Sequence, residues 1–332
     1  MTQASRVFPS VHSVLDPDAL CLEVAGQYSV GMPESCVLLR SWINEVYELR
    51  AGAARYILKV FRRGWRSPEE VSYEVALMEH LAACGLAVVP PVARRDGGRV
   101  GLVAAPEGTR PLVLYPLLEG RQLIPPSEQV YRRIGRAIAT MHRALDSFEP
   151  AAPRRALDVC TLAEEPLGWL RPLLAGRPAD WEFLSALAQR VRRRLDALEQ
   201  SGGLSWGPIH GDATLDNLLV TADDQIGIYD FDQSGPGWRA YELQGVFFYA
   251  WKSQQPSFWP ALLDGYSAVR SLRATDIAAM PCFVVLNQLW CMGFESQVIA
   301  RNHGRWIVDT GYFDRRIANL RSWAQAQDLM GA

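Results

Sequence analysis

The feature that most constrains the fold of this chain is a group of polar residues enclosed by apolar runs, in the stretch IHGDATLDNLLV (Ile209–Val220). Its two ends have the pattern of short strands, Pro208–His210 and Asn217–Val220, and its middle has the pattern of a turn. A His, two Asp and an Asn all resist burial. Such a cluster between buried strands is either a turn held by local hydrogen bonds or a reaction centre.

The residues that follow favour a reaction centre. NLLV leads away from the turn, TADDQ reverses the chain, and IGIYD returns to Asp230. A hairpin of this length is predicted to bring Asn217 and Asp230 near each other. An amide oxygen and a carboxylate that converge form a hard, oxygen-rich site suited to Mg²⁺. Asp212, five residues before Asn217, is then placed to accept a proton from an attacking hydroxyl group.

The composition is that of a soluble globular protein of one or two domains, with 332 residues, 49% hydrophobic and 21% charged. The net charge of −2 gives no general attraction to nucleic acid or anionic lipid. The N-terminus lacks the pattern of a signal peptide. The apolar segment MPCFVVLNQLWCMGF is interrupted by Asn287 and Gln288 and is too short to span a bilayer. We therefore expect a cytoplasmic protein with neither nucleic acid nor a membrane as partner.

The six cysteines are scattered without CxxC pairs, so they are expected to be reduced thiols of the core.

The first third of the chain has the pattern of a sheet with two helices. Asp16–Tyr28 is predicted to be a short helix, and the runs CVLLRS, NEVYELR and RYILKVF are predicted to form a meander. A second helix is expected to begin after Ser67 as N-cap, with Pro68 in its first turn, and to end at Gly85. The extended runs RVGLVAA and PLVLYPLL follow, separated by PEGTR.

After Gly120 the pattern becomes mainly helical. Apolar residues recur at three- and four-residue steps from Tyr131 to Leu145, as in an amphipathic helix. Residues 204–235 are the exception, since they contain short strands around polar turns. The sequence therefore predicts an α+β fold, with a small sheet-rich lobe (1–114), a larger, mainly helical lobe (115–332) and a hinge at about 114–118.

Phosphoryl transfer requires a metal, a base and a cation for the phosphates, and Lys59 is the candidate cation. Lys59 and Ile57 lie on the same face of a predicted strand, where a lysine inside an apolar run is costly unless it is paired. Glu74, in the middle of the next helix, is the natural partner. Glu70, one turn earlier and nearer the solvated helix start, is the alternative.

The motif HGDATLDN followed by YDFD, with ILKVF and a helix bearing a glutamate upstream, resembles the aminoglycoside phosphotransferase and choline-kinase-like superfamily. The resemblance covers nearly the whole chain and implies a bilobal, protein-kinase-like fold. It implies a small antiparallel-sheet N-lobe that binds ATP and a helical C-lobe. It further implies that Asp212 is the catalytic base and that Asn217 and Asp230 are the Mg²⁺ ligands.

The same resemblance assigns roles to residues nearer the N-terminus. Lys59 would contact the α- and β-phosphates of ATP, and Glu74 would orient it. The backbone around Tyr115 and Leu117 would meet the adenine edge. Glu242 stands where the family often has an aspartate that braces the catalytic loop.

The chain departs from the family pattern at two places. The loop in RSWINEVYEL has no glycine, so a GxGxxG phosphate cover is absent. Thr214 and Asp216 stand where relatives commonly have a His and a Gly, so no family role for that His is transferred to Thr214.

These patterns predict an ATP-dependent phosphotransferase that acts on the hydroxyl group of a small molecule, such as an antibiotic, an amino alcohol or a sugar. Basic residues slightly outnumber acidic ones from Gly245 to Ala332, which argues against a polycationic aminoglycoside as the acceptor. One alternative is a protein Ser/Thr kinase of the stress-response kinase A type, with a protein substrate, and another is a nucleotide-binding pseudokinase that acts as a binding module. His142 has no motif support and is predicted to be an ordinary helix or loop histidine.

Overall fold

The structure is a computed structural model that forms two compact units. The first unit consists of residues 1–79 and 89–117, and the second of residues 80–88 and 118–332. The lobe boundary predicted at about 114–118 stays a prediction. The structure describes residues 8–124, 126–300, 304, 306, 308–309 and 311–331.

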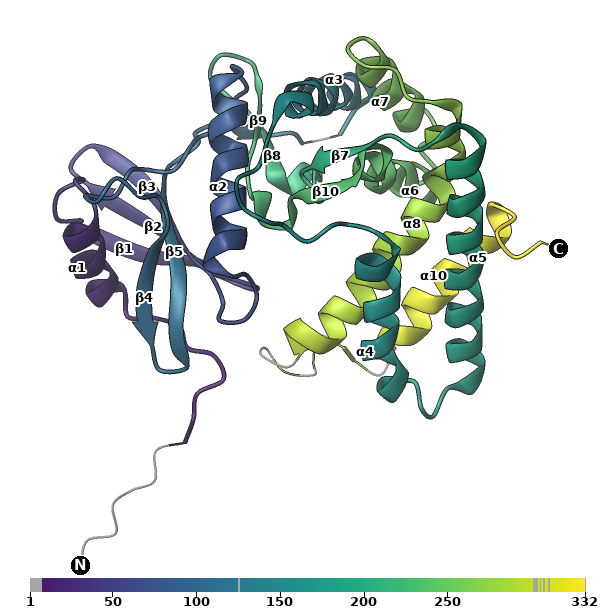
Figure 1. Ribbon diagram of the computed structural model, residues 1–332, viewed down its shortest axis with the longest axis horizontal. Helices are drawn as coiled ribbons and strands as arrows, with labels where there is room; N and C mark the ends of the chain where they lie inside the picture. Colours follow the sequence, from purple (N-terminus) through teal and green to yellow (C-terminus); the bar gives the residue numbers. More distant parts are fainter. Residues whose placement is uncertain are drawn as a thin grey trace, which may run out of the picture. The chain divides into compact units, whose positions relative to one another are not determined.

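The first unit is built on a five-stranded antiparallel sheet in the order β1-β2-β3-β5-β4 (Figure 1). The predicted meander is confirmed, and the two later extended runs form the hairpin β4–β5. The strands are β1 (Ser35–Ser41), β2 (Glu45–Ala51), β3 (Ala54–Val60), β4 (Gly101–Ala105) and β5 (Gly108–Pro116).

Helix α1 (Pro17–Gln27) covers one face of this sheet. The side chain of Asp16 caps it by accepting a hydrogen bond from the backbone nitrogen of Ala19 at 2.9 Å. Leu20 and Val24 of α1 pack on alternate residues of the strands, among them Leu58, in one fully buried cluster. Because successive side chains of a strand point to opposite faces, Lys59 must point away from α1.

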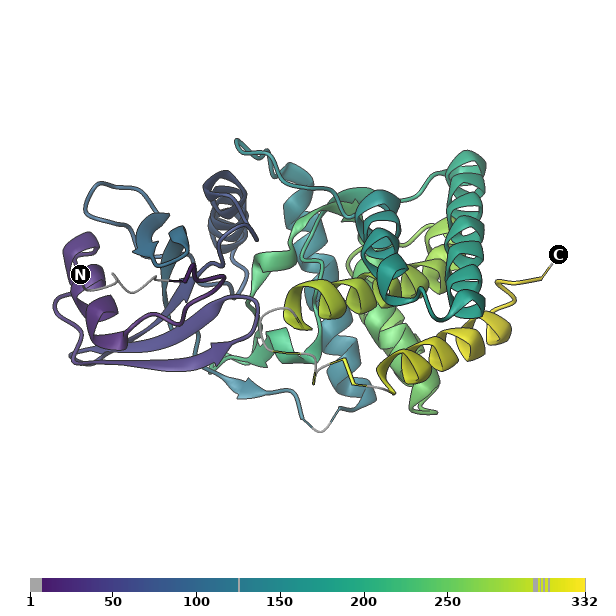
Figure 2. The ribbon, with the colours of Figure 1, turned by 90° about the horizontal axis from the view of Figure 1, so that it is seen from below.

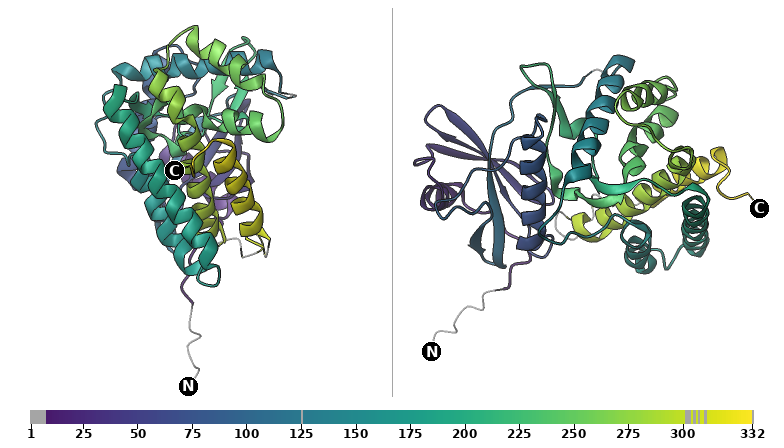
Figure 3. Two further views of the ribbon diagram at one scale, coloured as in Figure 1. Left: turned by 90° about the vertical axis from the view of Figure 1, so that its right-hand side faces the viewer. Right: turned by 45° about the horizontal axis from the view of Figure 1, so that its top comes forward.

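Helix α2 (Pro68–Ala83) begins and ends as predicted. Ser67 and Glu70 form a reciprocal capping box, with the hydroxyl of Ser67 3.2 Å from the nitrogen of Glu70 and the carboxylate of Glu70 3.0 Å from the nitrogen of Ser67. Gly85 follows the helix with φ +82°, a conformation that favours glycine. Figures 1 and 3 show α1 and α2 on opposite sides of the strands.

The second unit is mainly helical, and the predicted amphipathic helix is α3. Tyr131, Ile134 and Ile138 are buried, as their spacing predicts. α3 crosses α7 closely: a Cβ atom on Gly265 of α7 would meet the carbonyl oxygen of Arg132 at 1.8 Å, so the contact requires glycine. The helices of the unit are α3 (Glu128–Ala144), α4 (Glu165–Leu173), α5 (Pro178–Gly202), α6 (Gln244–Lys252), α7 (Phe258–Ser267), α8 (Ala274–Phe294) and α10 (Tyr312–Ala326).

Helix α8 corrects one prediction about membrane association. With the π-helical turn η6 (Glu295–Ile299), it forms a helix of 26 residues that is long and apolar enough to cross a membrane, so the segment is not too short. However, 61% of its apolar window is buried inside the protein. Figures 2 and 3 show α8 between α5 and α10. Its apolar character is therefore accounted for mainly by packing within the second unit.

Two small sheets complete the second unit. β7 (Trp206–Ile209) pairs with β10 (Gly235–Trp238), and β8 (Leu218–Val220) pairs with both β6 (Arg121–Gln122) and β9 (Ile226–Ile228). The sequence predicted β7, β8 and β9 but neither β6 nor β10.

The cysteines are free thiols, as expected, but they are not all in the core. Cys21 and Cys282 are buried, whereas Cys84 and Cys160 are exposed.

Candidate functional site

The hairpin predicted from the sequence is present in the second unit. Leu218 of β8 pairs with Ile228 of β9, and the backbone nitrogen of Tyr229 donates to the carbonyl oxygen of Asn217 at 3.1 Å. Asp230 is the next residue, so it leaves the hairpin beside Asn217.

Asp212 and Asn217 are joined directly. The side-chain amide of Asn217 donates to the carboxylate Oδ2 of Asp212 at 2.9 Å and to the backbone carbonyl of Asp212 at 2.8 Å. Both hydrogen bonds use the nitrogen Nδ2, so the amide oxygen Oδ1 is directed to other partners. Asn217 is buried, which fixes this orientation.

The environment of Asp212 disfavours its charged form. Its side chain reaches the surface, yet the surrounding protein reduces the hydration of the carboxyl group and raises its pKa from 3.8 to about 6. His210 lowers this pKa, the charge of Asp230 raises it, and the hydrogen bond from Asn217 lowers it. Asp212 and Asp230 are therefore near enough to repel each other electrostatically.

Asp230 has an unusual backbone conformation. Its φ of 62° and ψ of 61° lie in the left-handed region, directly before the 3₁₀ turn η4 (Phe231–Gln233). Aspartate tolerates this region better than most residues do, but it is still strained relative to glycine. An aspartate with a strained backbone, next to a second carboxylate and a buried amide, is typical of a functional site rather than of an ordinary turn.

Glu242, in the 3₁₀ turn η5 (Arg239–Leu243), holds the loop that carries Asp212. Its buried carboxylate accepts the backbone N–H of His210 at 2.6 Å, that of Gly211 at 2.9 Å and that of Ala213 at 3.4 Å. The bracing position that the resemblance suggested for Glu242 is therefore observed.

His210 supports the same loop from within. Its Nε2 lies 2.9 Å from the carbonyl oxygen of Tyr229, and its Nδ1 lies 3.2 Å from the backbone nitrogen of Asp212. Since a carbonyl only accepts and a backbone nitrogen only donates, the ring is protonated on Nε2 and accepts on Nδ1. His210 thus links the loop that carries Asp212 to the end of the hairpin.

His142 lies in a helix, as predicted, but it is not an ordinary helix histidine, because it contacts Glu242. Its ring is fully buried on α3, with Nε2 3.6 Å from the carboxylate of Glu242 and Nδ1 2.9 Å from the hydroxyl of Tyr266. Burial lowers the pKa of His142, and Glu242 acts in the opposite direction. No sequence signal identifies this contact, because His142 and Glu242 are a hundred residues apart and share no motif.

In the first unit, Lys59 and Glu74 form the expected ion pair. The nitrogen Nζ of Lys59 lies 3.1 Å from Oε1 of Glu74, and both side chains are buried. The ammonium group also lies 4.8 Å from the ring centroid of Phe61. The alternative partner, Glu70, caps α2 and pairs with Arg66 instead.

The predicted adenine-contacting residues lie at the end of β5. Tyr115 pairs with Ile57 of β3, and the backbone N–H of Leu117 donates to the carbonyl of Arg55 at 3.0 Å. That N–H is therefore engaged within the sheet. Because backbone groups alternate along a strand, the carbonyl of Pro116 points away from β3. The roles of Tyr115 and Leu117 in nucleotide binding stay predictions.

The donor set of Asn217 and Asp230 fits a hard cation that also binds phosphate. Both residues offer oxygen, and neither offers the nitrogen or sulfur that zinc prefers. Among the described residues, no group of three or more His, Cys, Asp or Glu is arranged to hold a metal. A protein-enclosed metal site is thus not seen in that part of the chain. Mg²⁺ suits such a partial site, since it is usually held by one or two side chains together with substrate phosphates.

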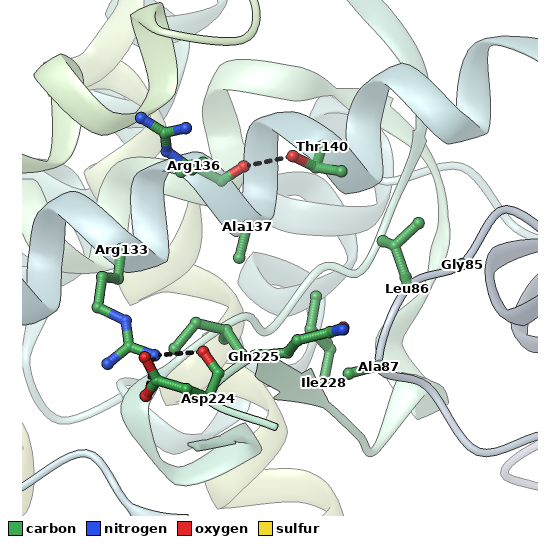
Figure 4. A pocket seen from close by; sticks show the side chains of 11 residues that line it. Gly85, Leu86, Ala87, Arg133, Arg136, Ala137, Thr140, Asp224, Gln225 and Ile228 are labelled. Atoms are coloured by element: carbon green, nitrogen blue, oxygen red, sulfur yellow. Dashed lines mark hydrogen bonds and ion pairs between the residues drawn. The ribbon is translucent and has the colours of Figure 1, made fainter. Parts of the chain in front are cut away.

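A separate pocket of about 280 Å³ lies elsewhere in the second unit, between the 85–87 segment, α3 and β9. Figure 4 shows Arg133 directed at Asp224, with 3.0 Å between Nη2 and Oδ1, and the hydroxyl of Thr140 bonded to the carbonyl of Arg136. None of the predicted site residues lines this pocket.

The chain is similar to several known proteins. A model of the phosphotransferase enzyme family matches residues 35–278. A protein of Deinococcus radiodurans, named only as uncharacterized, is 40% identical over 331 residues, covering 97% of this chain and 94% of its own. A homoserine kinase of Methylorubrum populi is 32% identical over 303 residues, covering 86% and 88%.

Among solved structures, a microcompartment-associated aminopropanol kinase superposes with a TM-score of 0.75 at 23% identity, covering 94% of this chain and 98% of its own. This likeness confirms the expected kinase-like α+β fold.

Proposed function

Since the chain belongs to the phosphotransferase enzyme family, as a kinase-type phosphotransferase, we propose that it transfers the γ-phosphoryl group of ATP to the hydroxyl group of a small molecule. The observation that carries this proposal is the hydrogen-bonded pair of Asp212 and Asn217, held by Glu242 beside Asp230.

Asp212 is proposed as the catalytic base. It orients the acceptor hydroxyl group and takes up its proton as the oxygen attacks the γ-phosphorus. Its raised pKa of about 6 still leaves it ionised at neutral pH, and makes it a stronger base than an ordinary aspartate.

Asn217 Oδ1 and the Asp230 carboxylate are proposed to hold Mg²⁺. When bound, the ion offsets negative charge on the phosphates of the nucleotide. The strained backbone of Asp230 supports this role, because residues with such conformations cluster at active sites and ligand-binding sites.

Lys59 is proposed to contact the α- and β-phosphates, with Glu74 fixing its orientation. Glu74 lies 3.1 Å from the buried ammonium group of Lys59, so it orients that group before a nucleotide binds. The backbone near Tyr115 and Leu117 is proposed to meet the adenine edge.

The acceptor is proposed to be a small amino compound with a hydroxyl group. The similar proteins are named for homoserine and aminopropanol, both of which combine a hydroxyl with an amine. Homoserine in addition carries a carboxylate. The excess of basic over acidic residues after Gly245 argues against a polycationic antibiotic.

The direct test measures ATP consumption against a panel of hydroxyl compounds that includes homoserine and 3-aminopropan-1-ol. We expect turnover by the natural chain, and a loss of about 10³-fold or more in Asp212→Asn and Asp230→Ala. Asp224→Asn is the matched control, since Asp224 lies exposed in the turn of the same hairpin. Undiminished turnover in either site variant would overturn the assignment. Phosphorylation of a generic protein, with no small compound accepted, would favour the protein-kinase alternative.

A further inference from the structure

A polar stripe runs along the otherwise apolar helix α8 and into η6. Asn287, Cys291 and Glu295 follow one another at four-residue spacing, so they lie on one face of the helix. All three are half-buried, whereas most residues of α8 are buried. At 1.5 Å per residue the stripe is about 12 Å long.

One end of the stripe is hydrogen-bonded to the 3₁₀ turn η5, whose residue Glu242 holds the loop that carries Asp212. The amide of Asn287 donates to the hydroxyl oxygen of Tyr241 at 3.1 Å, and Tyr241 directly precedes Glu242 in η5. The thiol of Cys291 lies 3.8 Å from Oδ1 of Asn287. The stripe therefore begins at the residues that brace Asp212.

The other end of the stripe carries a pair of opposite charges. Nη2 of Arg316, on α10, lies 2.5 and 2.7 Å from the two carboxylate oxygens of Glu295. Nη1 of the same guanidinium donates to Gln288 at 3.2 Å, and the hydroxyl of Tyr312 donates to Glu295. The side chain of Glu295 is 23% exposed and that of Arg316 is 29% exposed, so a ligand can reach both.

Cys291 is electrostatically coupled to both ends of the stripe. Burial raises the pKa of its thiol to about 12, Arg316 lowers it, and Glu295 and Asp212 raise it further. The thiol is therefore neutral at physiological pH. It provides an uncharged surface between the charged pair and the catalytic carboxylate.

We propose that Glu295 and Arg316 recognise the acceptor, and that they select a hydroxylated amino acid. The carboxylate of Glu295 binds the acceptor's ammonium group, and the guanidinium of Arg316 binds its carboxylate. The hydroxyl group then extends along the stripe toward Asp212. This inference rests on the proposed function and names the substrate class of the same site.

The charge balance of the pair explains why a zwitterion is favoured. An acceptor with only an ammonium group must take Glu295 from Arg316 and leave a half-buried guanidinium without its counter-charge. An acceptor with only a carboxylate group must take Arg316 from Glu295, which leaves the half-buried Glu295 carboxylate without its counter-charge. Stranding a partly desolvated charge is unfavourable. A zwitterion instead replaces both halves of the pair at once, so each protein charge keeps a partner.

The test compares three acceptors with Glu295→Gln and Arg316→Gln. Homoserine carries both charges, 3-aminopropan-1-ol lacks the carboxylate, and 4-hydroxybutanoate lacks the ammonium group. We expect Arg316→Gln to raise KM for homoserine roughly 10–100-fold and to lower the KM for 3-aminopropan-1-ol, because binding its ammonium group no longer leaves a guanidinium without its counter-charge. Glu295→Gln should raise KM for homoserine by a similar factor and lower the KM for 4-hydroxybutanoate, because binding its carboxylate no longer leaves Glu295 without its counter-charge. The KM for ATP should stay constant in both.

The matched control is Arg321→Gln. Arg321 lies on the same helix and pairs with Asp180 of α5 at 3.0 Å, so its loss removes a surface ion pair without touching the stripe. Its KM values should equal those of the natural chain.

A charge-swapped variant, Glu295→Arg with Arg316→Glu, separates recognition from a structural role. If the pair only joins η6 to α10, the swap restores turnover of homoserine, and the single variants lose all three acceptors equally. Either result overturns the inference while the proposed function stands. If the protein turns over other hydroxyl compounds but none of these three, the inference is overturned and the proposed function still stands. Absence of any ATP-dependent turnover by the natural chain would instead refute the proposed function.

Discussion

The carboxylate of Glu242 lies 2.9 Å from the backbone nitrogen of Gly211 and accepts its hydrogen bond. Gly211 has φ +84°, and a Cβ atom there would lie 2.4 Å from the carbonyl oxygen of Gln233. The loop therefore needs glycine for its conformation and Glu242 to hold that conformation. Since the Glu242 contacts are made within the protein alone, Asp212 is positioned before any ligand binds.

Glu242→Gln should destabilise the protein by about 1.5–3 kcal/mol, the range for hydrogen bonds to a charged group. The new amide nitrogen would face backbone donors and could not accept from them. Turnover should also fall, because Asp212 would no longer be fixed. Thermal unfolding and kcat, measured on the same preparations, check both effects. A variant as stable and active as the natural chain would show that the brace is dispensable.

The loss of stability caused by Glu242→Gln should depend on pH. The pKa of Glu242 is lowered in the folded protein: burial raises it, but the contacts with His142 and His210 outweigh that effect. A carboxyl group whose pKa is lower in the folded than in the unfolded state stabilises the folded protein at any pH above the unfolded pKa, here near 4.5. This stabilisation is lost as the pH falls through the folded-state pKa. The stability difference between variant and natural chain should therefore be largest above pH 5 and shrink in acid.

The buried pair in the first unit allows a double-mutant cycle. Glu74→Leu removes a carboxylate that lies 3.1 Å from the buried Lys59 ammonium group and should cost about 3–5 kcal/mol. Lys59→Met should likewise be destabilising, because it removes the ammonium group that lies 3.1 Å from the buried Glu74 carboxylate. The double variant, Lys59→Met with Glu74→Leu, should be more stable than either single one, since it buries no charge. Denaturant unfolding checks the order of the three. All three should lose ATP turnover.

Asp212→Asn should stabilise the protein while abolishing turnover. A pKa raised from 3.8 to about 6 means that the ionised carboxylate is disfavoured in the folded state. The folded protein therefore loses stability as the pH rises from 3.8 through about 6. At pH 8 the neutral amide removes this cost. We expect a gain of up to about 1 kcal/mol, well below the full value of the shift, because the side chain reaches solvent. Unfolding in EDTA measures it, and an unchanged or lower stability would contradict the prediction.

Local sequence signals located most of the secondary structure. Ser67 as N-cap and Pro68 in the first turn marked the start of α2, and strand alternation predicted that Ile57 and Lys59 share one face. In the structure that face lies opposite α1. These signals suffice because capping and strand alternation depend on neighbouring residues.

Contacts between distant segments could not be predicted in the same way. The two-residue strand β6 exists only because β8 offers it an edge, and neither its length nor its composition marks it. His142 meets Glu242 only through the packing of α3. The Glu295–Arg316 pair joins residues on separate helical segments, in a region where the sequence showed only mixed charges. Each of these features depends on tertiary packing, which local periodicity does not report.

Asp230 provides a test in which backbone and side-chain effects separate. Its φ of 62° is strained for any residue with a Cβ atom and unstrained for glycine. Asp230→Gly and Asp230→Ala both remove the carboxylate, so both should abolish Mg²⁺-dependent turnover and the stabilisation of the protein by Mg²⁺ with ATP. Without ligands, however, Asp230→Gly should be more stable than Asp230→Ala by about 1 kcal/mol, because only the glycine relieves the strain. Thermal unfolding in EDTA, and again with Mg²⁺ and ATP, checks both parts.

Equal stability of the two variants in EDTA would mean that the backbone at 230 relaxes once the aspartate is gone. A rise in melting temperature with Mg²⁺ and ATP that both variants retain in full would show that the carboxylate does not hold the metal.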